Sequence, residues 1–288
     1  MVRPESYGNK IYYTDDVAEK YNSSTSLNNI QSKLTQKCLE ILGNPTDSLI
    51  LDIGCGSGIS TENILDNSNY TVGIDISTDM LVLAKQRVEG IMYAEQPASD
   101  YCDFAAVDIG EGLPFKSASF DYAISVSVLQ WLAVQKDSKK LLNAFFYTLY
   151  DVLKTKGMAV LQYYPESEKQ MESIIKCASK YGFAGGTLVE NQDSKKKRKT
   201  YLILEMAGAK GSSVHIKEKR KPPHLKSQWQ TKTFPTEIGS SERKIKERAR
   251  AWLFLEHQST QVEEEDNSEI FSYIITLNIK TIDILYSC

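Results

Sequence analysis

The stretch 49–58 limits the fold of this chain more than any other, because an apolar run leads there into closely spaced glycines. The run Leu49–Ile53 is apolar except for Asp52, and three glycines follow at alternate positions, ending at Gly58. A short apolar run of this kind is typical of a parallel strand that is buried on both faces. Glycines allow a tight turn and let a ligand approach the main chain. Because residues 59–66 are compatible with a helix, the sequence predicts a strand, a glycine loop and the start of a helix.

The spacing of the glycines separates this loop from other nucleotide-binding loops. It is Gly-x-Gly-x-Gly with an acid two residues before the first glycine, whereas the dinucleotide fingerprint is Gly-x-Gly-x-x-Gly. The Lys-Ser/Thr pair of a phosphate-binding P-loop is also missing. The loop resembles motif I of class I S-adenosylmethionine-dependent methyltransferases. A tight turn without a ligand is the alternative interpretation, which the density of glycines disfavours.

Helical and strand patterns alternate along most of the chain, and this alternation sets the fold class. Residues 89–102 are expected to form a mixed loop. Strands that alternate with helices form a parallel sheet with right-handed crossovers, and two final strands without a helix between them predict a closing antiparallel hairpin. We therefore expect an α/β, Rossmann-like, mostly parallel sheet. The expected helices are 26–42, 59–66, 77–87, 136–153 and 166–181, and the expected strands are 48–53, 70–75, 104–107, 120–126, 158–163, 183–189 and 201–205.

Charge divides the 288 residues into three parts. Residues 1–194 carry 16 basic and 25 acidic side chains, net −9, whereas residues 195–250 carry 17 and 5, net +12. Residues 251–288 carry one basic and seven acidic side chains, net −6. We expect a folded domain over 1–207, a basic and flexible segment over 208–250 for RNA binding or nuclear targeting, and an atypical acidic and apolar tail over 251–288. A basic appendage on an acidic body favours a polyanionic partner, and a merely solvated linker is the alternative.

The remaining composition excludes several classes of protein. The five cysteines are scattered without a Cys-x-x-Cys pair, so we expect free thiols and no metal site. No apolar signal-peptide core opens the chain, and no apolar stretch is long enough to span a membrane. The sequence therefore predicts a protein that does not associate with membranes.

Four expected strands end in an acid or a small polar residue, and ligands bind at this edge of an open α/β sheet. Asp75 follows Asp52 by 23 residues, near the usual offset for an acid that binds ribose hydroxyls. Asp108 is placed to accept from the adenine amine, with the Ile109 N–H as donor. Asp52 and the loop amides are placed to hold the methionine end. A single acid of this kind is often only a helix cap. The expected cofactor-binding set is Asp52, Gly54, Cys55, Gly56, Asp75, Ile76, Asp108, Ile109 and Ser125.

The acceptor is expected after the fourth strand, at Gln130 and Trp131. Gln130 offers amide donors and acceptors, and Trp131 offers a stacking face. A core tryptophan beside a glutamine that caps a helix is the alternative. The three histidines lie beyond the expected domain, at positions 215, 224 and 257. Transfer of a methyl group to a neutral lone pair needs placement rather than a base, so we expect no catalytic side chain.

Eight short motifs occur in order and carry a closer resemblance, to the eukaryotic small-subunit (18S) ribosomal RNA guanine-N7 methyltransferase family. The resemblance covers about residues 1–207. The motifs are Val2-Arg3-Pro4-Glu5, Tyr21-Asn22-Ser23-Ser24, Leu51–Gly58, Gly73–Ser77, Gly112-Leu113-Pro114-Phe115, Phe120-Asp121, Leu129-Gln130-Trp131 and Leu161-Gln162-Tyr163-Tyr164-Pro165.

The resemblance implies an activity, a cofactor and partners. S-adenosylmethionine would be the donor, S-adenosylhomocysteine the product, and guanine N7 of pre-ribosomal 18S rRNA the acceptor. It further implies a role in small-subunit maturation in the nucleus, with some protein in the cytoplasm, and a heterodimer with a small zinc-binding activator subunit. Carried over by position, the family's cofactor contacts are Gly54, Gly56, Asp75, Asp108 and Ile109, with Gln130 and Trp131 beside the substrate.

Two departures and two other functions stay open at this point. Residues 88–104 are longer than the family pattern. The resemblance also implies a basic tail to the end of the chain, whereas the basic character of this sequence stops near Arg250. A small-molecule carboxyl or oxygen methyltransferase would carry the same loop, but it would not need the basic segment. A ribosome-assembly scaffold whose methylation activity is dispensable is the second alternative.

Overall fold

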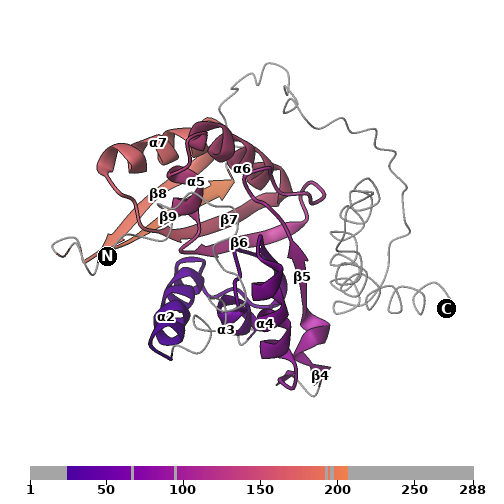
Figure 1. Ribbon diagram of the computed structural model, residues 1–288. Helices are drawn as coiled ribbons and strands as arrows, with labels where there is room; N and C mark the ends of the chain where they lie inside the picture. Colours follow the sequence, from indigo (N-terminus) through magenta and orange to yellow (C-terminus); the bar gives the residue numbers. More distant parts are fainter. Residues whose placement is uncertain (1–24, 66–67, 94–95, 192–193, 195–197, 207–288) are drawn as a thin grey trace, which may run out of the picture.

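The computed structural model describes residues 25–65, 68–93, 96–191, 194 and 198–206. The expectations for residues 1–24, for the basic segment 208–250 and for the tail 251–288 lie outside the described residues. Within them the chain forms a seven-stranded mixed sheet with helices on both faces (Figure 1), and a second sheet of two short strands.

The sheet contains seven strands in the order β5-β2-β1-β6-β7-β9-β8. The first five are parallel to one another, and β9 runs antiparallel to both β7 and β8. The expected closing hairpin is therefore confirmed, and its second strand lies between β7 and β8. The strands are β1 (Leu49–Ile53), β2 (Tyr70–Asp75), β5 (Cys102–Ala106), β6 (Phe120–Val126), β7 (Leu153–Tyr163), β8 (Phe183–Glu190) and β9 (Lys199–Met206).

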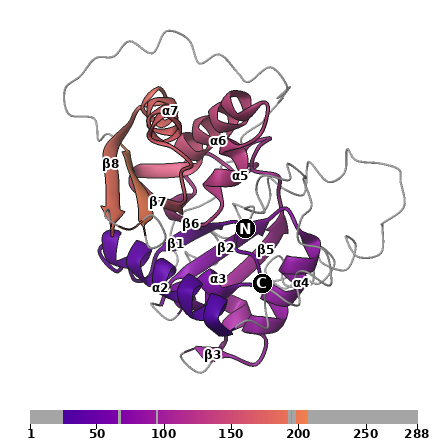
Figure 2. The same cartoon turned by 60° about the vertical axis from the view of Figure 1, so that its left-hand side comes forward.

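Helices cover the sheet in two layers because alternate residues of each strand point to opposite faces. Leu49, Leu51 and Ile53 pack with α6, whereas Ile50 packs with α2 and α3. Figures 1 and 2 show α2, α3 and α4 on one side of the sheet and α5, α6 and α7 on the other. The helices are α2 (Thr25–Ile41), α3 (Ile59–Leu65), α4 (Thr78–Val88), α5 (Leu129–Ala133), α6 (Ser138–Val152) and α7 (Glu168–Ser179).

The strand order reverses at β1, and this reversal determines where a ligand can bind. From β1 the chain builds outward through β2 to β5, and then returns to place β6 and β7 on the other side. Crossovers to opposite sides of β1 leave a crevice at the carboxyl ends of β1 and β6. The glycine loop follows β1, so it lies at this crevice.

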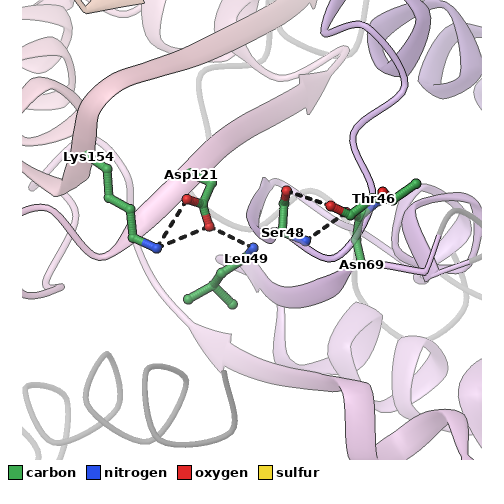
Figure 3. Close-up of polar contacts among 6 residues, drawn as sticks. All are labelled: Thr46, Ser48, Leu49, Asn69, Asp121 and Lys154. Atoms are coloured by element: carbon green, nitrogen blue, oxygen red, sulfur yellow. Dashed lines mark hydrogen bonds and ion pairs between the residues drawn. The ribbon is translucent and has the colours of Figure 1, made fainter. Parts of the chain in front are cut away.

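Polar side chains pin the opposite, amino edge of the sheet (Figure 3). Asp121 of β6 accepts a hydrogen bond from the Leu49 N–H at 3.0 Å, and the Lys154 ammonium lies 3.1 Å from both of its oxygens. Next to them, the Ser48 N–H donates to the Asn69 side chain at 3.1 Å. These bonds connect the starts of β1, β2, β6 and β7, and so they fix the register of the sheet away from the ligand edge.

Three expectations about local structure were wrong. Residues 89–102 contain more regular structure than the expected mixed loop, because β3 (Met92–Tyr93), β4 (Gln96–Pro97) and a 3-10 helix (Ala98–Tyr101) form there. The buried Ala98 and Cys102 pack with Leu65 and Val88, which gives this stretch a small core. The short helix α5 was not expected, and β7 begins five residues earlier than the expected strand because its pairing with β6 shifts register.

No helix among the described residues is both long and apolar enough to cross a bilayer.

Candidate functional site

The glycine loop is tied to the end of the neighbouring strand. The main-chain N–H groups of Gly54 and Cys55 both donate to the Ile74 carbonyl of β2, at 2.7 and 2.9 Å. The loop is therefore connected covalently to β1 and by hydrogen bonds to β2, and its position depends on both strands.

Gly54 is required by its backbone and by its neighbour. Its φ is +70°, and a Cβ at this position would lie 2.2 Å from a methyl carbon of Val128. No side chain fits into that distance, so Val128 can cover the loop only because residue 54 is glycine. This contact joins the loop after β1 to the turn after β6.

Asp75, at the end of β2, holds the loop and the next helix with one carboxylate. One oxygen accepts from the Gly56 N–H at 3.0 Å, and the other accepts from the Ser77 N–H at 2.9 Å. Burial raises the pKa of Asp75, while these main-chain donors act in the opposite direction. The hydroxyl of Ser77 caps α4 by accepting from the Met80 N–H. Beside this carboxylate the side chain of Ile76 is 40% exposed, an apolar surface against which a flat ring can pack.

Asp108 lies next to Asp75, one strand further toward the sheet edge. The Val107 N–H donates to the Asp75 carbonyl at 2.9 Å, which brings the two strand ends together. One Asp108 carboxylate oxygen accepts from the Gly110 N–H at 2.9 Å, so the acid also shapes its own turn. Ile109 is half-buried against the main core.

Asp52 is the most buried acid of the site, with a side chain that is 1% exposed. One oxygen accepts from the hydroxyls of Ser60 and Thr61 of α3, both at 2.7 Å. The other oxygen, Oδ1, is buried and receives no hydrogen bond from any residue that the structure describes. Burial raises the pKa of Asp52 to about 6 despite the two hydroxyl donors. An acceptor that is buried and unsatisfied in this way fits a cationic group of a ligand.

Two members of the expected cofactor-binding set, Cys55 and Ser125, have side chains that are buried and contact other parts of the protein. The Cys55 side chain is 4% exposed and packs toward Gly73, and burial raises the pKa of its thiol well above the ordinary range. Cys55 can therefore meet a ligand only through its main chain. The Ser125 hydroxyl donates to the Ile53 carbonyl at 2.9 Å, which ties β6 to β1.

On the acceptor side the two expected residues differ in exposure. Gln130 is 3% exposed, and its amide nitrogen donates to the Ser127 carbonyl at 2.8 Å. This bond ties Gln130 to its own turn but does not cap α5, whose first turn has no side-chain cap. Trp131, the next residue in α5, is half-buried. Of the two, Trp131 is the more exposed residue.

Sequence reasoning assigned no role to two residues behind this turn. Ser127 has a φ of +61°, and Gln162 of β7 is fully buried and accepts from both its N–H and its hydroxyl. A polar residue inside the apolar run 158–163 was the available signal for Gln162. Nothing in the sequence indicates that Ser127 adopts a left-handed backbone conformation.

Taken together, the carboxyl ends of four neighbouring strands carry the expected site residues side by side. The site offers a glycine turn that admits a ligand to the main chain, two acids with main-chain donors beside them, an exposed apolar face at Ile76 and a buried acceptor on Asp52. These features fit the parts of S-adenosylmethionine, which are ribose hydroxyls, a flat base and a cationic amino-acid end.

Comparisons with known proteins agree with this geometry. A family profile described as "Methyltransferase domain" matches residues 51–161. The chain is 41% identical to the 18S rRNA (guanine-N(7))-methyltransferase bud23 of Schizosaccharomyces pombe over 217 residues, which are 73% of this chain and 76% of that protein. It is also 41% identical to the 18S rRNA (guanine-N(7))-methyltransferase of Bos taurus, over 70% of each chain.

A solved structure shows the same fold at low sequence identity. The N-methyltransferase NodS of Bradyrhizobium japonicum, solved in complex with S-adenosylhomocysteine, superposes with a TM-score of 0.51 and 16% identity. The match covers 71% of this chain and 98% of NodS. The Rossmann-like fold expected of a class I methyltransferase is therefore confirmed.

The substitution Asp75→Ala is expected to weaken binding of S-adenosylmethionine by about 1–3 kcal/mol, because the ribose loses a charged acceptor and the Gly56 N–H loses its anchor. Isothermal titration calorimetry measures this change. Asp121→Ala is the matched control, since it removes a carboxylate that also binds a main-chain N–H, but at the opposite edge of the sheet. Unchanged affinity in folded Asp75→Ala protein would contradict the cofactor assignment.

The affinity for S-adenosylmethionine is expected to rise roughly tenfold between pH 5 and pH 7. Below a pKa of about 6 Asp52 is protonated, and it must lose that proton before it can face a cation. Above this pH the carboxylate is already charged, so the affinity levels off. Calorimetry at both pH values tests this, and Asp52→Asn should flatten the profile. An equal slope in that variant would show that another group titrates.

Proposed function

This chain belongs to the family of 18S rRNA (guanine-N7)-methyltransferases, and we propose that it transfers a methyl group to N7 of a guanine in small-subunit ribosomal RNA. The observation that carries this function is the 41% identity to the S. pombe relative over three quarters of that protein's length. The enzyme is a methyltransferase that depends on S-adenosylmethionine. The strand-end acids and the glycine loop give the proposal its physical basis.

The residues of this site bind and orient rather than exchange protons. S-adenosylmethionine supplies an electrophilic methyl group on a sulfonium. Guanine N7 presents a lone pair in the plane of the base, so no side chain has to remove a proton before it attacks. In this proposal Asp75 binds the ribose, Asp108 and the Ile109 N–H bind the adenine, and Asp52 faces the amino-acid end. The rate then depends on alignment and on exclusion of water.

The charge distribution supports an approach of RNA from the α5–α6 side. Residues 25–134, which build the cofactor half, carry five basic and fourteen acidic side chains, net −9. Residues 135–190 carry eight and six, net +2. Three lysines gather at the start of α6, directly after α5, around a surface hollow of about 420 Å³. A phosphate backbone is repelled by the first region and attracted to the second. The hollow is lined by Lys136, Asp137, Ser138, Lys139, Lys140 and Asn143.

The outer edge of β5 supports the further proposal of a partner, a small zinc-binding activator subunit. β5 is the last strand on its side of the described sheet (Figure 1). Because the Val107 N–H points to β2, the alternation of a strand turns the N–H groups of Phe104 and Ala106 outward. An edge of this kind pairs readily with a strand from another chain. The partner would then brace Asp108, two residues after Ala106.

A role in maturation of the small ribosomal subunit follows from the proposed substrate. We place the protein in the nucleus, where ribosomal RNA precursors are processed, and also in the cytoplasm.

The function is tested by incorporation of labelled methyl groups into 18S rRNA and into small carboxylic acids, with and without a co-expressed activator subunit. We expect label on RNA at guanine N7, mapped by chain cleavage specific for that modification, and none on the acids. Asp75→Ala should lose most of the incorporation. Label on the acids alone would support the small-molecule alternative, and no label on any acceptor would support the scaffold.

Replacing Ala106 by proline is expected to abolish the complex with the activator, because proline removes an outward N–H while the ladder to β2 stays intact. Co-purification measures the complex. Ala106→Val is the matched control, since it changes the side chain and keeps the N–H. If Ala106→Pro still co-purifies with the activator, or if the isolated chain is stable and fully active, the β5 edge is not the interface.

A further inference from the structure

The turn between β6 and α5 has a backbone that a serine rarely adopts. Ser127 lies directly after β6 with a φ of +61°, in the left-handed region that favours glycine. Such a conformation persists only where the surrounding structure holds it, and it is frequent at functional sites. The contacts of Ser127 therefore show what maintains the turn.

One buried residue provides most of these contacts, through both its side chain and its main chain. Gln162 is 0% exposed and lies on β7 between β6 and β9. Its amide oxygen accepts from the Ser127 N–H at 3.1 Å and from the Ser127 hydroxyl at 3.0 Å. Its main-chain oxygen accepts from the same N–H at 2.9 Å, and its amide nitrogen donates to the Tyr163 carbonyl at 3.3 Å. Both ends of the amide are thus used, and its orientation is fixed.

The turn held in this way sets the geometry on both sides of the site. Val128, the next residue, covers Gly54 so closely that no side chain is possible there. The Ser127 carbonyl receives the Gln130 amide, and the Val128 carbonyl receives the Trp131 N–H at 2.9 Å. The positions of the glycine loop and of helix α5 therefore both depend on the backbone of residues 127 and 128.

We propose that Gln162 is a positioning residue for methyl transfer, which acts by keeping Ser127 left-handed. This inference rests on the proposed function. Gln162 lies behind the turn and contacts neither reactant. Methyl transfer requires the reacting atoms within about 3–3.5 Å and aligned, and a displacement of about 1 Å costs on the order of 100-fold in rate. A turn that relaxes to an ordinary φ would move Val128 and α5 relative to the glycine loop.

A cycle of two substitutions separates positioning from simple packing. Gln162→Leu keeps the volume and removes the amide, so kcat on 18S rRNA is expected to fall roughly 10- to 100-fold, with smaller changes in KM. Ser127→Gly adopts the left-handed conformation without help. In the Ser127→Gly background, Gln162→Leu should therefore cost only a few-fold, on the order of threefold, in kcat. Thr71→Val, a buried strand residue outside the site, is the control and should leave kcat unchanged.

An equal loss of kcat in both backgrounds would overturn the proposal, as would a loss that follows the fraction of unfolded protein in a melting curve. A crystal structure of the Gln162→Leu variant gives a second test that does not require activity. The proposal expects Ser127 at negative φ and a wider separation of Val128 from Gly54, and a retained left-handed Ser127 would refute it. If the wild-type chain transfers no methyl group to RNA, the proposed function fails, and this structural test still decides the role of Gln162.

Discussion

The site depends on a central strand that is paired on both edges and buried on both faces. All five residues of β1 are buried, between β2 on one side and β6 on the other. Asp52 is the one charged residue in this strand, and burial raises its pKa to about 6. A raised pKa means that Asp52 stabilises the fold fully only below its unfolded value, and this contribution is lost as the pH rises through about 6. Near neutral pH the free enzyme thus retains a charge at a cost in stability, which a bound cation would offset.

The acids at the strand ends serve the protein as well as the ligand. Asp75 binds two main-chain N–H groups, Asp108 binds one, and Asp52 binds two hydroxyls. The helix-cap interpretation and the ligand interpretation are therefore compatible, because a carboxylate oxygen can accept more than one hydrogen bond. Acids that are already held in this way are pre-organised for a ligand.

Local patterns predicted the cofactor half of the domain well, and contacts between distant segments explain what was missed. The apolar run of β1, the strand β2 and the start of α4 are local features, and the structure has them within about a residue of the expected positions. The placement of β9 inside the sheet, the packing of Ala98 and the left-handed Ser127 depend on residues that lie far away in the sequence. The assignment of Gln130 as a substrate contact stays a prediction, since its side chain is buried against its own turn.

The position of β9 determines when the chain can finish folding during its synthesis. β7 is complete at Tyr163, but its second edge pairs with β9, which ends at Met206. β8 leaves the ribosome earlier than β9 and pairs with it in the described sheet. A nascent chain that has just exposed β8 therefore presents an unpaired apolar edge on β7 and a strand without its neighbour. Such intermediates attract chaperones and aggregate readily, so a pause in translation that leaves β8 but not β9 outside the ribosome would be more harmful than one after both strands have emerged.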